Sequence, residues 1–262
     1  MAQPRIVSLL PSATEIAVAL GLGESLVGRS HECDYPLFVK ALPVVTSTRL
    51  EKGLTSRQID DRIQEIVRQG LSVYEVDTAL LRDLRPDLIL TQSQCAVCAV
   101  TPADLEEALG DWIGTAPTLL SLAPDTLEDV WSDFAKVAEA AGIPERASSV
   151  VGDLKERMSG LSRSSAERMD RPRVAAIEWI DPLMAAGNWV PELIEAAGGH
   201  PLFARAGEHS SWLNWDDLIA AADHFNGAID RVLADAENHT PDLSGKATTA
   251  GVSDAVAFEI SK

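Results

Sequence analysis

Four side chains that could hold a metal or carry redox chemistry lie in two short stretches of the chain. Cys95 and Cys98 are two residues apart in QSQCAVCAV, and His31 and Cys33 lie in HECDYP. One imidazole and three thiolates could form a tetrahedral zinc site, although His-x-Cys is an unusual spacing for a zinc knuckle. A Cys-x-x-Cys pair could also exchange disulfides if it opened the helix of a thioredoxin-like unit. Because cysteine is among the most frequently buried residues, we favour a third interpretation, in which these thiols line or support a loop.

Both stretches follow predicted strands. The segments LVGRS (26–30) and DLILTQ (87–92) are short apolar runs, typical of buried parallel strands, and RIVSLLP (5–11) and TLLSL (118–122) have the same character. Helical segments separate these runs, which predicts a doubly wound α/β lobe. Ligands of open α/β sheets bind beyond the carboxyl ends of the strands. We therefore expect the loops after these strands to meet at one edge of the sheet.

Capping signals and short apolar runs predict the smaller elements of this lobe. Ser12 with Glu15 is a capping box for a helix that ends at Gly21. Ser56 is predicted to cap a helix with its apolar residues on one face. Short strands are expected at 43–46 and 73–76, and short helices around Leu80–Leu84 and from about 102 to 109.

Residues 124–168 are predicted to be helical. One amphipathic helix is stopped by Gly142, and a second helix of about 25 residues follows, which at 1.5 Å per residue would be about 37 Å long. RVAAIEW (173–179) then predicts a strand and PELIEAAGG (191–199) a helix, so another α/β unit begins there. This order favours a rigid strut between two lobes; the alternative is a surface helix packed on one core.

Composition and missing signatures exclude several functions. The chain has 262 residues and a net charge of −18, so its surface should repel nucleic acid and anionic membranes. It contains no apolar run long enough to span a membrane. The N-terminal apolar segment lacks a basic region and is interrupted by Pro11, so we expect no signal peptide and a cytoplasmic chain as given. No Ser-His-Asp order, Walker loop or GxGxxG motif indicates an enzyme.

Six stretches in order resemble the cobalamin-binding branch of the iron-siderophore/cobalamin substrate-binding proteins, which serve ABC importers. They cover about residues 4–223 and read RIVSLLPSATEI, LVGRSHECDYP, LPVVT, RPDLILTQSQCAVCAV, EWIDPLMAAGNWVPELIEAAGG and SSWLNWDDLIAA. The resemblance implies two α/β lobes with mostly parallel sheets, joined by one long helix as in class III periplasmic binding proteins. It also implies a ligand, cobalamin or a related corrinoid or iron complex, held in the cleft between the lobes without catalysis. Such proteins usually work in the periplasm or at the cell surface.

The candidate ligand-binding residues follow predicted strands or are aromatic residues of the second lobe. A corrin ring is broad and flat with amide groups round its edge, so aromatic faces and hydrogen-bonding side chains suit it. A neutral imidazole could also bind cobalt axially, although we favour a role for this histidine in shaping its loop. The candidates are Ser12, Thr14, His31, Cys33, Tyr35, Gln94, Cys95, Cys98, Trp179, Asn188, Trp189, Trp212 and Trp215.

The resemblance ends after Asp223. Residues from about 225 to 260, with AIDRVLAD and TPDLSGKATTAGVSDAV, resemble the C-terminus of β-decarboxylating dehydrogenases of the isopropylmalate and tartrate type. That family's catalytic residues are not visible upstream, so the resemblance implies no dehydrogenase activity. We predict an N-terminal lobe at 1–123, a helical region with the strut at 124–170, a truncated C-terminal lobe at 171–223 and an unrelated tail at 224–262. The truncation predicts weakened ligand retention.

Two features bear on partners and on alternative functions. In the family, an acidic residue after a Gly-Gly pair docks on the importer, whereas His200 follows Gly198 and Gly199 here. The alternative functions are a thiol- or zinc-dependent enzyme that uses the His31, Cys33, Cys95 and Cys98 cluster, or a non-functional fusion remnant.

Overall fold

The computed structural model describes residues 3–69, 71–93, 100, 102, 105, 112, 115–166, 171–222, 232 and 234–235. The chain divides into two compact units, 1–157 and 158–262, and the boundary falls inside the long helix α6 (Glu145–Ala166). The predicted division into four segments stays a prediction. Gln94, Cys95 and Cys98, most of the expected helix at 102–109 and nearly all of the tail at 224–262 lie outside the described residues.

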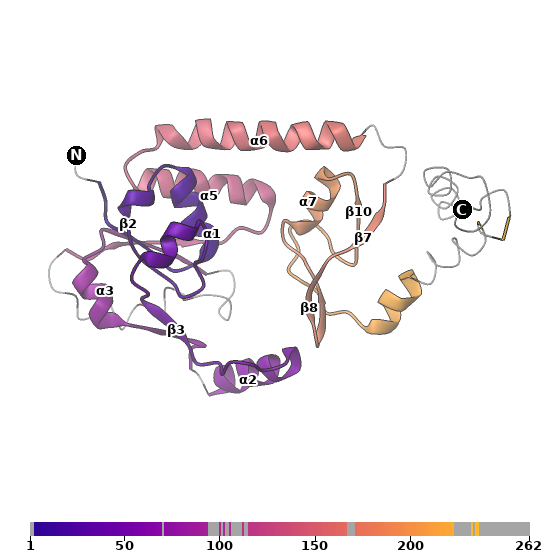
Figure 1. The fold of residues 1–262 in the computed structure, drawn as a ribbon, viewed down its shortest axis with the longest axis horizontal. Helices are drawn as coiled ribbons and strands as arrows, with labels where there is room; N and C mark the ends of the chain where they lie inside the picture. Colours follow the sequence, from indigo (N-terminus) through magenta and orange to yellow (C-terminus); the bar gives the residue numbers. More distant parts are fainter. Residues whose placement is uncertain are drawn as a thin grey trace. The chain divides into compact units, whose positions relative to one another are not determined.

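Unit 1 is built on a four-stranded parallel sheet (Figure 1). Its strands are β1 (Ile6–Ser8), β2 (Leu26–Arg29), β5 (Leu88–Gln92) and β6 (Thr118–Leu122), in the order β2-β1-β5-β6. All four were predicted from their apolar runs. From β1 the chain continues to β2 on one side of β1, and it then returns to β5 and β6 on the other side. The strand order therefore reverses between β1 and β5.

Helices cover both faces of this sheet because successive strand residues point to opposite faces. Ile6 and Leu88 pack into a core with α1 (Pro11–Ala19), α5 (Leu127–Ala140) and the first turns of α6. Val7 and Ile89 pack on the opposite face with Leu81 of α3 (Thr78–Leu84). On the first face, Lys155 of α6 bonds to a carboxylate oxygen of Glu128 on α5 at 2.9 Å. This two-sided burial explains why the strands read as continuous apolar runs.

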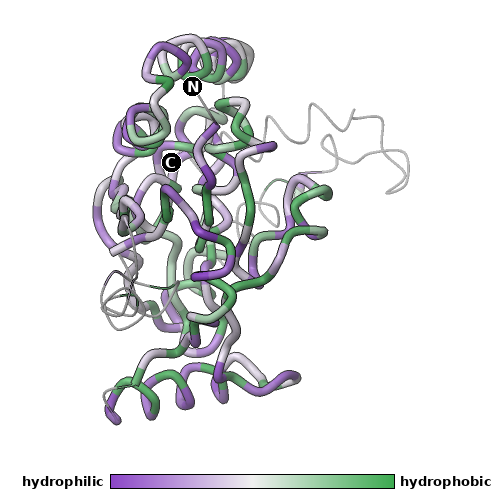
Figure 2. Tube along the Cα trace, turned by 90° about the vertical axis from the view of Figure 1, so that its left-hand side faces the viewer, coloured by the Kyte–Doolittle hydropathy of each residue, from purple (hydrophilic) through white to green (hydrophobic). Residues whose placement is uncertain are grey.

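In the segment between β2 and β5, the position of one strand and the cap of one helix differ from the prediction. Strands β3 (Thr46–Thr48) and β4 (Tyr74–Val76) form an antiparallel pair, and α2 (Ser56–Arg68) connects them. The strand expected at 43–46 is wrong in position, since Val44 makes only an isolated bridge to Arg29. Thr55, not Ser56, caps α2, and a capping box with Gln58 fixes that start. Hydrophilic and hydrophobic positions alternate along α2, the lowest helix in Figure 2.

The predicted capping box at the start of α1 is also wrong. The N-cap is Leu10, which makes no side-chain cap bond, and Pro11 is the first helical residue. Proline is suited to this position because its φ is already helical and it has no N–H to satisfy. The helix therefore begins before Ser12, and Gly21 follows its C-cap with a φ of +77° as expected. Short 3-10 helices occur at Gly23–Ser25 (η1) and Leu37–Ala41 (η2).

The part of unit 2 that the structure describes contains two small sheets. Strand β7 (Arg173–Ala175) pairs in parallel with β10 (His200–Leu202), and β8 (Ile177–Ile180) pairs antiparallel with β9 (Leu183–Ala185). The single strand predicted at 173–179 is therefore two strands. The change of partner at Ala176 explains the break: its carbonyl accepts the N–H of Ala186 at 2.9 Å, outside the parallel pair.

The helices of the central and C-terminal regions agree with their predictions. Helix α6 has 22 residues, about 33 Å at 1.5 Å per residue, and α7 (Val190–Ala196) lies between β9 and β10. Residues 215–222 are also helical. Within the described ranges, none of the helices combines the length and apolar character needed to cross a bilayer.

Candidate functional site

The candidate site begins at the carboxyl edge of the unit 1 sheet, where the strand order reverses. Ligands of open α/β sheets bind beyond the strand ends at such a reversal. Helix α1 starts directly after β1, so exposed Ser12 lies in the first helical turn at this edge. Exposed Ser93 follows β5, and residues 30–43 follow β2. Three neighbouring strands therefore bring two hydroxyl groups and a long loop to one edge.

The β2 loop, residues 30–43, is closed at its base by backbone hydrogen bonds. The N–H of Arg29 donates to the carbonyl of Pro43, and the N–H of Val45 donates to the carbonyl of Arg29, both at 2.9 Å. A compact loop with its ends held together can present side chains to solvent without unfolding. Its exposed apolar side chains are Tyr35 (62% exposed), Leu37 (75%) and Phe38 (50%).

His31 is half-buried and held by groups from two neighbouring segments. The Thr46 hydroxyl oxygen accepts the His31 N–H at 3.0 Å and lies 2.8 Å from Nδ1 of the imidazole. The ring also lies against Tyr74, with centroids 5.7 Å apart. The Tyr74 hydroxyl donates to Glu32 at 3.3 Å, and burial, followed by the nearby Glu32 charge, raises the pKa of Tyr74. With Nδ1 occupied by Thr46, Nε2 is the ring nitrogen that could bind a metal.

Thr14 and Cys33 lie beneath this edge, and both are fully buried. The Thr14 hydroxyl is 2.8 Å from the Ser8 hydroxyl and 3.1 Å from Sγ of Cys33, and Ser8 donates to the Leu10 carbonyl at 3.2 Å. Burial raises the pKa of the Cys33 thiol, which keeps it in the unreactive protonated form. The structure therefore gives these two candidates a supporting position below the β2 loop, away from the surface.

The zinc-site hypothesis finds no support in the described part of the chain. Groups of three or more His, Cys, Asp or Glu side chains that could hold a metal do not occur there. Cys33 is bonded to Thr14, and His31 is bonded to Thr46. The remaining two proposed ligands, Cys95 and Cys98, lie outside the described residues.

In unit 2, the candidate Asn188 shapes a tight loop before α7. It has a φ of 52°, a left-handed conformation that asparagine tolerates better than most residues. Its N–H donates to the Glu208 carbonyl at 2.7 Å, and its carbonyl accepts the Gly207 N–H at 3.0 Å. The side-chain Oδ1 is buried and has no hydrogen-bond partner among the described residues. Trp189 follows as the N-cap of α7 and is half-buried.

The other tryptophans of unit 2 differ in exposure. Trp179 is half-buried, and its indole N–H donates to the Asp181 carbonyl at 3.0 Å. Trp212 is 60% exposed and bridges to Met184 of β9, and Trp215 is 51% exposed. Exposed aromatic side chains of this size can cover a flat apolar ligand.

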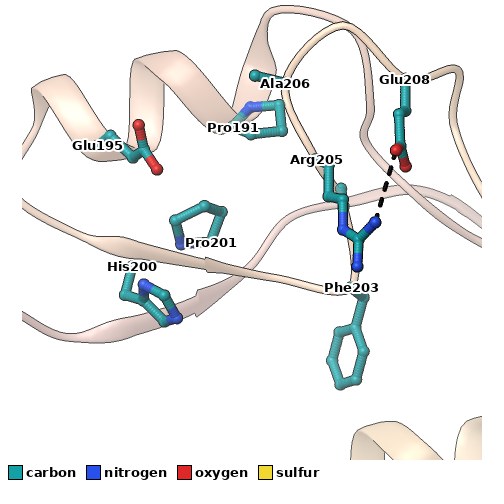
Figure 3. A pocket seen from close by; sticks show the side chains of 9 residues that line it. Pro191, Glu195, His200, Pro201, Phe203, Arg205, Ala206 and Glu208 are labelled. Atoms are coloured by element: carbon teal, nitrogen blue, oxygen red, sulfur yellow. Dashed lines mark ion pairs between the residues drawn. The ribbon is translucent and has the colours of Figure 1, made fainter.

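Unit 2 also has a surface hollow of about 580 Å³ that the sequence did not indicate. Figure 3 shows Glu195 and His200 on one side and Arg205, paired with Glu208 at 3.7 Å, on the other. His200 lines this hollow at the position where the resemblance implies an acidic docking residue.

The structure adds polar residues to the site that sequence reasoning missed. Arg29 and Thr46 both hold the β2 loop, and Tyr74 supports His31. Arg29 and Thr46 occupy strand ends, where polar residues are common. The sequence pattern therefore gave no reason to predict that these two residues contact the β2 loop. Tyr74 lies in a short predicted strand 43 residues after His31, and only tertiary structure brings these two rings together.

Comparison with known proteins decides the family. A model of the periplasmic binding protein family matches residues 6–224. The chain belongs to the periplasmic binding protein family. The vitamin B12-binding protein of Photorhabdus laumondii is 24% identical to this family member over 203 residues, which are 77% of this chain and 62% of that protein. The chain thus spans less than two thirds of that relative's length.

Similar solved structures confirm the predicted α/β fold. The periplasmic vitamin B12 binding protein of Vibrio cholerae has 21% identity and a TM-score of 0.57, covering 83% of this chain and 73% of that one. The periplasmic heme-binding protein of Roseiflexus sp. RS-1, in its apo form, has 22% identity and a TM-score of 0.59, covering 99% and 100%. The resemblance of the tail to dehydrogenases stays a prediction.

Proposed function

We propose that this periplasmic binding protein family member is the substrate-binding protein of an ABC importer, and that it binds cobalamin or a related corrinoid or iron complex. It has no catalytic role in this proposal. The observation that carries the proposal is the β2 loop, which holds exposed Tyr35 and half-buried His31 at the sheet edge where α/β folds bind ligands. The vitamin B12 and heme named for its relatives are both planar metal macrocycles.

The chemistry of the described side chains fits such a ligand. The exposed ring of Tyr35 can lie against a flat macrocycle, and Ser12 and Ser93 can meet polar groups at its edge. The imidazole of His31 is a suitable axial ligand for cobalt or iron because Thr46 holds its Nδ1. Thr14 and Cys33 support the β2 loop in this proposal, and Asn188 and Trp189 shape a loop of unit 2.

A thermal-melt comparison tests the proposal. The protein is melted alone and with cyanocobalamin, aquocobalamin, haemin or a ferric hydroxamate siderophore. A ligand that binds the folded state at 100 times its Kd adds about 2.7 kcal/mol, so the true ligand should raise the Tm by several degrees. A protein whose Tm is unchanged by every ligand would contradict the proposal.

Two variants and one control show whether the aromatic residues carry the binding. Tyr35→Ala and Phe38→Ala, both exposed on the β2 loop, should each reduce the ligand-induced shift, whereas Leu161→Ala, which removes a 68% exposed side chain from α6, should leave it unchanged. Equal shifts in all three variants would place the ligand elsewhere. Metal analysis of the purified protein separates the enzyme alternative, since one equivalent of zinc would favour a thiol-zinc site.

The partner in this proposal is the permease of an ABC importer. His200 lines the unit 2 hollow with Glu195, so the expected docking position offers an imidazole beside a carboxylate. A His200→Glu variant that raises transport in reconstituted vesicles would support a weakened docking contact at this position. A variant with unchanged or lower transport would count against it.

A further inference from the structure

Arg29, the last residue of β2, contacts more of the β2 loop than any candidate named from the sequence. Its Nη1 donates to the carbonyls of Ser30 at 3.0 Å, His31 at 3.5 Å and Cys33 at 3.0 Å. Its Nη2 donates to the carbonyl of Lys40 at 3.2 Å. One guanidinium therefore joins the first residues of the loop to its far side.

The backbone of the same residue closes the base of the loop. The Arg29 N–H and carbonyl bond to Pro43 and Val45, so the main chain fixes the loop ends while the side chain fixes the interior. The acceptors are backbone carbonyls that turn toward the guanidinium and leave the exposed Tyr35 and Leu37 side chains on the loop surface. Both the backbone and the side chain of Arg29 therefore make hydrogen bonds that order this loop.

Lysine cannot reproduce these contacts. The guanidinium is a planar fork of five N–H donors, whereas an ammonium group is a compact charge on a flexible stem. A single ammonium can approach the near carbonyls or the Lys40 carbonyl, but it does not span both in one geometry. Hydrogen bonds from a charged donor are about twice as strong as neutral ones, so their loss should loosen the loop.

We propose that Arg29 is a positioning residue that holds the β2 loop in its ligand-binding shape, an inference that rests on the proposed function. A loop that is already ordered loses less conformational entropy on binding, which raises affinity without any contact between Arg29 and the ligand. Arg29 thus determines how well Tyr35 and His31 are presented.

The test compares Arg29→Lys with Arg5→Lys. Arg5 is a matched control because it also donates to backbone carbonyls, Leu84 at 2.6 and 2.9 Å and Arg85 at 3.3 Å, but it precedes β1 at the amino end of the sheet. Amide hydrogen exchange is measured for peptides covering 30–43 and for core peptides of β5. Calorimetry measures the affinity for whichever of cyanocobalamin, aquocobalamin, haemin and the ferric hydroxamate siderophore raises the Tm of the wild type.

We expect Arg29→Lys to speed exchange in the β2 loop about tenfold and to weaken ligand binding about tenfold, with core exchange unchanged. Arg5→Lys should leave both the loop and the affinity unchanged. Unchanged loop exchange in Arg29→Lys, or a loosened loop with unchanged affinity, overturns the role of Arg29. A wild-type protein that binds none of the ligands overturns the proposed function, and the positioning role with it. If amide exchange in Arg29→Lys is fast in the core peptides as well as in the loop, the variant is unfolded. Arg29→Gln, which keeps two N–H donors, is then measured in the same way.

Discussion

The buried hydroxyl of Thr14 should contribute measurably to the stability of unit 1. The Thr14 hydroxyl lies 2.8 Å from the Ser8 hydroxyl and donates to Sγ of Cys33 at 3.1 Å, and the Cys33 thiol donates to the Ser8 carbonyl at 3.9 Å. Thr14→Val keeps the side-chain shape but removes two of these hydrogen bonds. At about 1 kcal/mol each, their loss should lower the free energy of unfolding by about 2 kcal/mol.

Chemical denaturation followed by tryptophan fluorescence measures this change, and Thr14→Ser is the matched control. The serine keeps the hydroxyl and loses one buried methyl group, which costs about 1 kcal/mol. The hydrogen-bond argument therefore predicts that valine is the more damaging substitution, although it is the more apolar one. If Thr14→Val were as stable as the wild type, or more stable than Thr14→Ser, this reasoning would be refuted.

Two further experiments test the pH dependence of stability and the packing of Gly187. Burial raises the pKa of Cys33 above its usual value of 9.0, so the unfolded thiol releases its proton at lower pH than the folded thiol, and the free energy of unfolding should fall as pH rises above about 9. Denaturation of Cys33→Ala at a series of pH values should show a smaller fall, and a fall equal to that of the wild type would contradict this explanation. Gly187→Ala would place a Cβ 2.5 Å from the Glu208 carbonyl oxygen and 2.6 Å from the Ser210 nitrogen, so about 3 kcal/mol or the fold of unit 2 should be lost. Gly152→Ala, in open space on α6, should instead gain up to about 1 kcal/mol, and equal melting of the two variants would be the contrary result.

The strands of unit 1 were predictable because burial on both faces leaves a continuous apolar run, as in Leu88–Gln92. The break in the strand expected at 173–179 was not predictable, since it depends on which partner each half meets: β10 for one and β9 for the other. The start of α1 was missed because Pro11 and Ser12 both signal a helix N-terminus, and proline determined the position.

The site was predictable at the level of loops but not of individual side chains. Strand ends indicated that HECDYP would lie at the sheet edge, where Tyr35 is exposed; its ligand-binding role stays a prediction. The sequence could not show that Cys33, two residues away, points into the core beside Thr14. Nor could it show that Arg29 bonds to carbonyls as far along as Lys40, because this depends on the path of the folded loop.

The central proposal is that the protein binds a corrinoid or iron complex, and equilibrium titration tests it most directly. Purified protein is titrated with cyanocobalamin, with haemin and with a ferric hydroxamate siderophore, and binding is followed by calorimetry and by the ligand's visible absorbance. The account predicts saturable one-to-one binding of one of these ligands in the micromolar range, weaker in Tyr35→Ala and unchanged in Leu161→Ala. The absence of saturable binding for all three ligands, with a folded protein, would contradict it.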